Sequence, residues 1–122
     1  MFSKTINILG TEYEIKTSLW QDDKYMQENG LDGYCAEYGK SIVVVDPEDK
    51  EYFKWFDSKE EIEKSYKETV RHEVFHAYLN ESGLSSSAAV PTDGWAKNEE
   101  MIDWFAIQSP KIFKTFQELG VL

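Results

Sequence analysis

Apolar and polar positions alternate in the first part of the chain. Ile6 and Ile8 fall on one side of an extended segment, and beyond Gly10 the residues Tyr13 and Ile15 alternate with charged side chains. A period of two is typical of a half-buried strand, and a glycine between two such segments indicates a tight turn. The pattern therefore predicts an antiparallel β-hairpin.

A second hairpin is predicted over residues 33–46. Residues 42–45 form a run of β-branched side chains after Gly39 and Lys40, and Pro47 ends the run because proline has no N–H for a strand ladder. Two roles suit residues 42–45. They would serve either as an edge strand that binds an extended peptide through main-chain hydrogen bonds, or as a buried core strand.

After Ser58, the spacing of the apolar positions changes from two residues to three and four. Ser58 and Glu61 have the spacing of a capping box, and apolar side chains then recur at helical intervals as far as Gly83. This pattern predicts one long helix over residues 58–83. The small and polar residues that follow predict an exposed loop over residues 85–94.

A last helical region is predicted from Trp95 to Gly120, with an interruption where Ser109 can cap a new helix and Pro110 can take its first position. Strands followed by helices in a chain of 122 residues predict a single domain, residues 1–122, of the α+β class. We expect a small antiparallel or mixed sheet of about four strands, packed on the long helix and on the C-terminal helical region.

The composition argues against several classes of protein. The net charge is −10 and Arg71 is the only arginine, whereas proteins that hold a nucleic-acid backbone carry clustered lysine and arginine. No run of about 18 apolar residues is present that would span a bilayer. Cys35 is a lone cysteine, and Met1 is not followed by the apolar core of a secretory signal. We therefore expect a cytoplasmic protein with no nucleic-acid or membrane partner.

The two histidines of the chain form an HExxH pattern inside the predicted long helix. His72 and His76 are four residues apart, so both imidazoles project from one helix face, and Glu73 follows the first of them. Two such imidazoles can bind one divalent cation while the glutamate reaches a water molecule beside it. We predict that His72 and His76 are metal ligands and that Glu73 is the general base.

A hydrolytic zinc site needs a third protein ligand and keeps its fourth position for water. No histidine remains, so a carboxylate is expected, and the last helical region offers Glu99, Glu100 and Asp103. Glu99 and Asp103 are one helical turn apart, so Glu99 would bind the metal while Asp103 accepts the ring N–H of a ligand histidine. Glu100 is the alternative third ligand. Zn²⁺ is the expected ion, and nickel or cobalt would suit the same donors.

These motifs resemble those of the zincin metallopeptidases of the gluzincin branch. The resemblance implies that His72, His76 and Glu99 bind zinc, that Glu73 is the general base and that Asp103 supports a histidine. The residues that continue the glutamate motif, and most of the remaining chain, are similar to small zincin-like proteins of phages and mobile elements, including the ImmA-type metallopeptidases. The resemblance implies a minimal zincin-like fold.

The leading hypothesis is a zinc-dependent peptidase, related to phages or mobile elements, that cleaves a narrow range of protein or peptide substrates. The alternative is a catalytically silent zincin-fold module that binds or inhibits another protein, because no residue is an evident oxyanion stabiliser. Tyr34, Tyr38, Tyr78, Arg71 and a backbone amide are considered for that role, although helical geometry turns Tyr78 away from the His76 face. A structural phage component is a third hypothesis.

Overall fold

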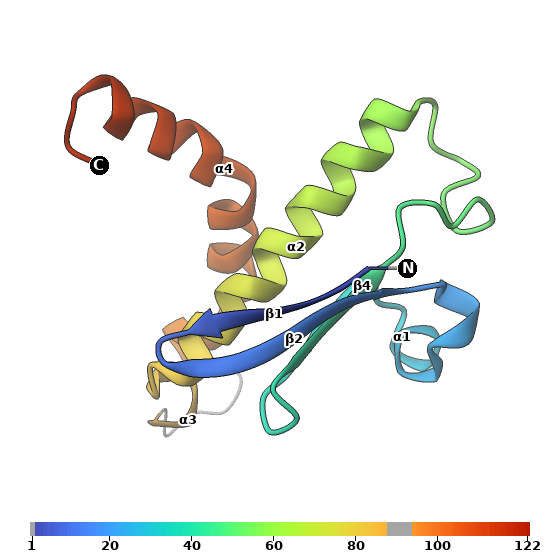
Figure 1. Cartoon of the computed structure of the whole chain (residues 1–122), viewed down its shortest axis with the longest axis horizontal. Helices are drawn as coiled ribbons and strands as arrows, with labels where there is room; N and C mark the ends of the chain where they lie inside the picture. The colour runs from blue at the N-terminus through green and yellow to red at the C-terminus, as the bar shows by residue number, and fades with distance from the viewer. Residues whose placement is uncertain (1, 88–93) are drawn as a thin grey trace.

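Figure 1 shows a twisted sheet with a long helix beside it and a second long helix beyond. The computed structural model describes residues 2–87 and 94–122. The strands are β1 (Ser3–Ile8), β2 (Thr11–Ser18), β3 (Gly33–Ala36) and β4 (Ser41–Val45). The helices are α1 (Lys24–Asn29), α2 (Lys59–Glu81), α3 (Leu84–Ser87) and α4 (Glu99–Glu118), and the 3₁₀ turns are η1 (Trp20–Asp22) and η2 (Trp95–Lys97).

The four-stranded sheet is mixed, with the order β1-β2-β4-β3. β1 pairs antiparallel with β2, and β3 pairs antiparallel with β4, which confirms both predicted hairpins. A parallel pairing of β2 with β4 joins the two hairpins, with Glu14 opposite Ser41 at one end and Ser18 opposite Val45 at the other. The predicted α+β class with a small mixed sheet is therefore confirmed.

β4 is an inner strand, so the suggestion that residues 42–45 form a peptide-binding edge is wrong. Four of its five side chains are buried, which agrees with the core-strand alternative; they are Ile42, Val43, Val44 and Val45. The local pattern did not separate the two roles, because a run of β-branched residues suits either an edge or a strand buried on both faces. The free edge next to β4 belongs to β3.

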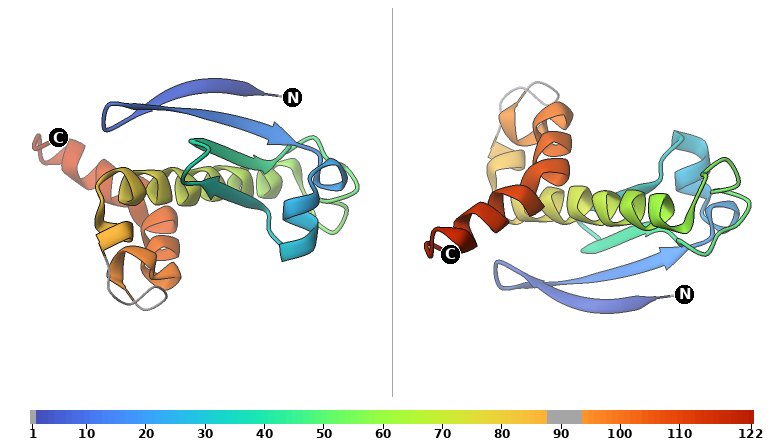
Figure 2. Two further views of the ribbon diagram at one scale, coloured as in Figure 1. Left: turned by 90° about the horizontal axis from the view of Figure 1, so that it is seen from below. Right: turned by 90° about the horizontal axis from the view of Figure 1, so that it is seen from above.

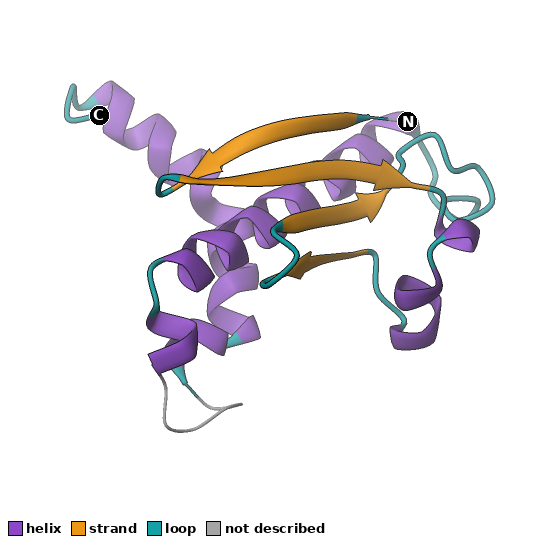
Figure 3. Cartoon of the chain, turned by 60° about the horizontal axis from the view of Figure 1, so that its bottom comes forward, coloured by secondary structure: helices purple, strands orange, loops and turns teal. Residues whose placement is uncertain are grey.

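The helix α2 runs across one face of the sheet (Figure 3). The Ser58 side chain accepts a hydrogen bond of 3.2 Å from the Glu61 amide, and Gly83 beyond the helix end has a φ of 84°. These features confirm the predicted long helix. Buried residues from both layers form its junction with the sheet: Ile8, Tyr13, Ile15, Ile42, Val44 and Ala77.

Two helices differ from the sequence prediction. α4 continues through Ser109 and Pro110, so the predicted interruption is wrong. α1 was not predicted because its stretch of chain is mostly polar. It forms because the Asp23 side chain caps it by accepting from the Met26 amide at 2.9 Å, and because the Met26 side chain is fully buried.

The connection between α2 and α4 is only partly described. Ser85, which we expected in an exposed loop, is buried and belongs to α3. Residues 88–93 of that predicted loop lie outside the described residues. Within the two described ranges, no helix has the combination of length and hydropathy that a membrane span requires.

Hydrogen bonds to one carboxylate fasten the C-terminal end of α2 to both hairpins. Glu81 accepts from the Thr11 hydroxyl and from the Tyr13 phenol, each at 2.8 Å, and forms an ion pair with Lys40. Thr11 and Tyr13 belong to β2, and Lys40 lies in the turn before β4. The half of α2 that carries the HExxH pattern is thereby held at a fixed position against the sheet.

The strand β3 approaches α2 so closely that a side chain is excluded at Gly33. A Cβ atom there would lie 2.9 Å from Thr69 Cγ2 on α2 and 3.0 Å from Val44 Cγ1 on β4. Glycine is needed because the helix and the neighbouring strand already occupy that space.

We predict that Gly33→Ala destabilises the fold by about 1–3 kcal/mol, since the added methyl forces α2 and β3 apart. Urea unfolding followed by circular dichroism would measure the change. Gly39→Ala is the matched control, because its added methyl would be no closer than 3.6 Å to Ala36 Cβ. Equal effects of the two substitutions would contradict the steric explanation.

Candidate metal centre

The two histidines of α2 direct their Nε2 atoms toward one point. His72 and His76 are separated by one helical turn, and their Nε2 atoms are 3.1 Å apart. Both side chains are about four-fifths buried. Burial lowers the pKa of His76, which favours the neutral imidazole, although the charge of Glu99 acts in the opposite direction. A neutral imidazole keeps a lone pair for a metal ion.

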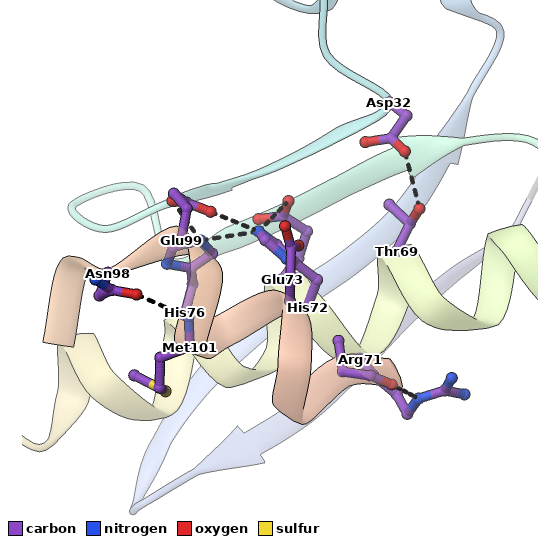
Figure 4. A network of polar contacts seen from close by, with 11 residues as sticks. Asp32, Thr69, Arg71, His72, Glu73, His76, Asn98, Glu99 and Met101 are labelled. Carbon is purple, nitrogen blue, oxygen red and sulfur yellow. Dashed lines mark hydrogen bonds and ion pairs between the residues drawn. The ribbon is translucent and has the colours of Figure 1, made fainter. Parts of the chain in front are cut away.

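The third donor comes from the first residue of α4. Asn98 caps this helix by accepting from the Met101 amide at 2.7 Å. The cap fixes the start of α4 and therefore the position of Glu99. Glu99 Oε2 lies 3.1 Å from His72 Nε2, and Glu99 Oε1 lies 3.1 Å from His76 Nε2 (Figure 4). Of the two glutamates that the sequence left open, Glu99 is therefore the one that contacts both imidazoles.

These three donor groups have the spacing that a zinc ion would require. Zinc bonds to nitrogen and oxygen are about 2.0–2.1 Å long, so two ligands of a tetrahedral ion are about 3.3 Å apart. The two Nε2 atoms are 3.1 Å apart, and each lies 3.1 Å from a different oxygen of the Glu99 carboxylate, which is close to this spacing. Two imidazoles and one carboxylate are also a donor set that zinc accepts. The residues therefore fit a zinc ion with a fourth position left for water.

The Asp103 side chain fixes the orientation of the first imidazole. Asp103 lies one turn beyond Glu99 on α4, and its Oδ1 atom is 2.8 Å from His72 Nδ1. A carboxylate at this distance accepts the Nδ1 proton, so the lone pair of His72 is left on Nε2, facing the donor cluster. This is the geometry expected for the predicted supporting role.

Glu73 lies beside the donor cluster and is buried. Its Oε1 atom is 3.9 Å from His72 Nε2, and its side chain is 7% exposed. The ligating atoms of His72, Glu73 and His76 all lie within 4.8 Å of one another. Burial raises the pKa of Glu73 to about 8 in the metal-free chain, and nearby carboxylates act in the same direction. A divalent cation would oppose both effects.

A cavity of about 350 Å³ opens beside the cluster and gives it access to solvent. Its walls include His72, Glu73 and His76 on one side, and Gly33 and Cys35 of β3 on the other. The free edge of the sheet therefore borders the space in front of the imidazoles.

Sequence reasoning missed several residues that line this cavity, among them Leu31, Glu37 and Asn80. Asn80 lies one turn after His76 on the same face of α2, so helical spacing was the available signal. Its amide contacts Cys35, with 3.8 Å between Asn80 Nδ2 and Cys35 Sγ. Burial raises the pKa of the Cys35 thiol to about 12, so the thiol stays protonated and is a poor nucleophile.

The side chains considered as oxyanion stabilisers are occupied elsewhere or exposed. The Tyr34 phenol donates to Asp23 Oδ2 at 2.9 Å, and Tyr38 is 94% exposed. Arg71 donates to a main-chain carbonyl of α4, and Tyr78 is on the exposed surface. Among these four, none has its polar group directed at the donor cluster.

We predict that Glu99→Gln lowers the affinity for zinc at least about tenfold, because it removes the anionic ligand. Competition with a chromophoric chelator would measure the affinity. Glu100→Gln makes the same change of charge one residue away and should leave the affinity near that of the wild type. The reverse result would assign the ligand role to Glu100.

Comparisons with protein-family models, with curated proteins and with solved structures give no match to this chain. The functional interpretation therefore rests on the geometry of the donor cluster and its surroundings.

Proposed function

We propose that this protein is a zinc-dependent peptidase of the gluzincin type. The observation that carries the proposal is the meeting of the His72 and His76 Nε2 atoms, 3.1 Å apart, with the Glu99 carboxylate, whose two oxygens lie 3.1 Å from one imidazole each, beside the buried carboxylate of Glu73. When bound, zinc supplies a Lewis acid that acidifies water and polarises the scissile carbonyl.

Glu73 acts as the general base in this proposal. Its carboxylate lines the cavity next to both imidazoles, so it can take a proton from the attacking water and pass it to the leaving amine. His72 and His76 contribute lone pairs, and Asp103 keeps the His72 lone pair on Nε2. Glu99 completes the donor set from the neighbouring helix.

The strand proposed to hold an extended substrate is β3. Val45 N donates to Asp32 O at 2.9 Å, so these two residues form a hydrogen-bonded pair at the end of the antiparallel ladder between β3 and β4. Along such a ladder, successive residues of one strand point their main-chain N–H and C=O groups alternately toward the partner strand and away from it. By that alternation, the main-chain groups of Gly33 and Cys35 point away from β4, toward the free edge. Both residues line the cavity, so a peptide added at this edge would pass the donor cluster.

Acidic residues surround the proposed substrate path. Glu37 lines the cavity at β3, and Asp32 and Glu68 line a second cavity of about 190 Å³ on the other side of His72. The whole chain carries a net charge of −10. A protein substrate with a basic segment at the cleaved bond would be attracted to such a surface. The narrow substrate range predicted from the sequence remains part of this proposal.

A protein-binding module without turnover is the second proposed function. It is favoured by one observation, the engagement of Tyr34 with Asp23 and of Arg71 with α4, which leaves these two candidate oxyanion donors occupied. A site of this kind could retain zinc and present β3 to a partner strand without cleaving it.

We predict that Glu73→Gln keeps zinc affinity within a few-fold of the wild type and lowers peptide cleavage by about 10²–10⁴-fold. Cleavage would be followed by mass spectrometry on a library of unstructured peptides incubated with the zinc-loaded protein. Glu63→Gln, at an exposed position of α2, is the control for the change of charge.

The same variants separate the competing functions. Biological activity that survives Glu73→Gln but not the loss of zinc would favour the binding module. Activity that survives both His72→Ala and His76→Ala would favour a purely structural role. Absence of zinc binding by the wild-type protein at neutral pH would contradict the metal-dependent functions altogether.

A further inference from the structure

The only arginine of the chain connects the two helices of the metal centre. Arg71 lies on α2, directly before His72, and its Nε atom donates to the carbonyl oxygen of Ala106 on α4 at 2.6 Å (Figure 4). Ala106 is 2% exposed. A buried carbonyl requires a donor, and here a side chain from another helix supplies it.

Pro110 explains why this carbonyl is available. In a regular α-helix, the Ala106 carbonyl would accept from the N–H of the residue four positions later, and that residue is Pro110, which has none. The proline ring also crowds the same carbonyl and bends the helix. Figure 2 shows α4 changing direction between its orange first half and its red second half.

The contact lies next to the residues of the donor cluster on both helices. Arg71 is adjacent to His72, and Ala106 lies one turn after Asp103 and two turns after Glu99. The Glu99 and Asp103 side chains are each 63% exposed, so packing around these side chains does little to hold them. Their position is set mainly by how the first half of α4 lies along α2.

We propose that Arg71 is a positioning residue for the metal centre. Its hydrogen bond to the carbonyl that Pro110 leaves free holds α4 in the register at which Asp103 reaches His72 and Glu99 reaches both histidines. The consequence for zinc rests on the proposed function. The consequence for the contact between Asp103 and His72 does not, because it concerns the metal-free chain.

Two substitutions separate the hydrogen bond from the charge of the arginine. Methionine has an unbranched chain that ends at the position of Arg71 Nε and has no donor there. Glutamine places an amide nitrogen at that position without the charge. A third substitution, Pro110→Ala, returns a main-chain N–H to residue 110, which then satisfies the Ala106 carbonyl within α4. Arg71 then has no free acceptor on α4, so Arg71→Met should have no further effect in that background.

The experiment compares the wild type with Arg71→Met, Arg71→Gln, Pro110→Ala and the Arg71→Met/Pro110→Ala double variant. Zinc affinity is measured by chelator competition. In the zinc-free proteins, nitrogen-15 NMR detects the hydrogen-bonded Nδ1 proton of His72. Lys67→Gln, an exposed position of α2, controls for the loss of one positive charge.

We expect Arg71→Met to lower zinc affinity by about 10- to 100-fold and to weaken the Nδ1 signal. Arg71→Gln and Lys67→Gln should resemble the wild type in both measurements, whereas Pro110→Ala and the double variant should resemble Arg71→Met. Should Arg71→Met not fold, Arg71→Lys replaces it, because lysine keeps the charge but places its donor one bond further out.

The proposal is overturned if Arg71→Met leaves both measurements unchanged, or if its effect is as large in the Pro110→Ala background as in the wild type. A wild-type protein that binds no zinc would contradict the proposed function, whereas a weaker Nδ1 signal in zinc-free Arg71→Met would still support the positioning role of Arg71.

Discussion

The candidate metal centre depends on the meeting of two imidazole nitrogens and one carboxylate at separations of 3.1 Å. Asp103 takes the Nδ1 proton of His72, so a neutral His72 presents only a lone pair to Glu99. A lone pair facing a carboxylate is unfavourable unless a cation lies between them. A divalent cation at this position would bind both the lone pair and the carboxylate, so metal binding would be linked to the stability of the cluster.

The cluster is formed by side chains of α2 and α4, so the relative positions of its donor atoms depend on how these two helices pack. α2 is held by its Ser58 cap at one end and by the hydrogen bonds to Glu81 at the other. α4 is held by side chains near its first turns, including the Phe75 and Phe105 rings, which stack with centroids 4.3 Å apart. Burial of apolar surface is non-directional, whereas a hydrogen bond to one carbonyl selects one register. The contact of Arg71 supplies that selection.

Local signals in the sequence were sufficient to predict most helices and strands and the residues that meet in the donor cluster. The Ser58 cap, the turn at Gly10 and the spacing of His72 and His76 each depend on residues close in the chain, and each is found in the structure. The parallel pairing of β2 with β4 depends on distant residues, so the sequence could not show that β3 is an edge strand and β4 an inner one. Pro110 was misread because the donor that compensates for it comes from a different helix.

The close approach at Gly33 links the fold to the proposed chemistry. Thr69, which excludes a side chain there, lies one turn before Glu73 on α2. The spacing between β3 and α2 therefore also determines how far the β3 edge lies from the carboxylate proposed as general base. A wider gap would still allow a peptide to add to β3, but would move its carbonyl groups away from the donor cluster, and catalysis is sensitive to such displacements. The requirement for glycine at position 33 is thus a requirement of the site as much as of the sheet.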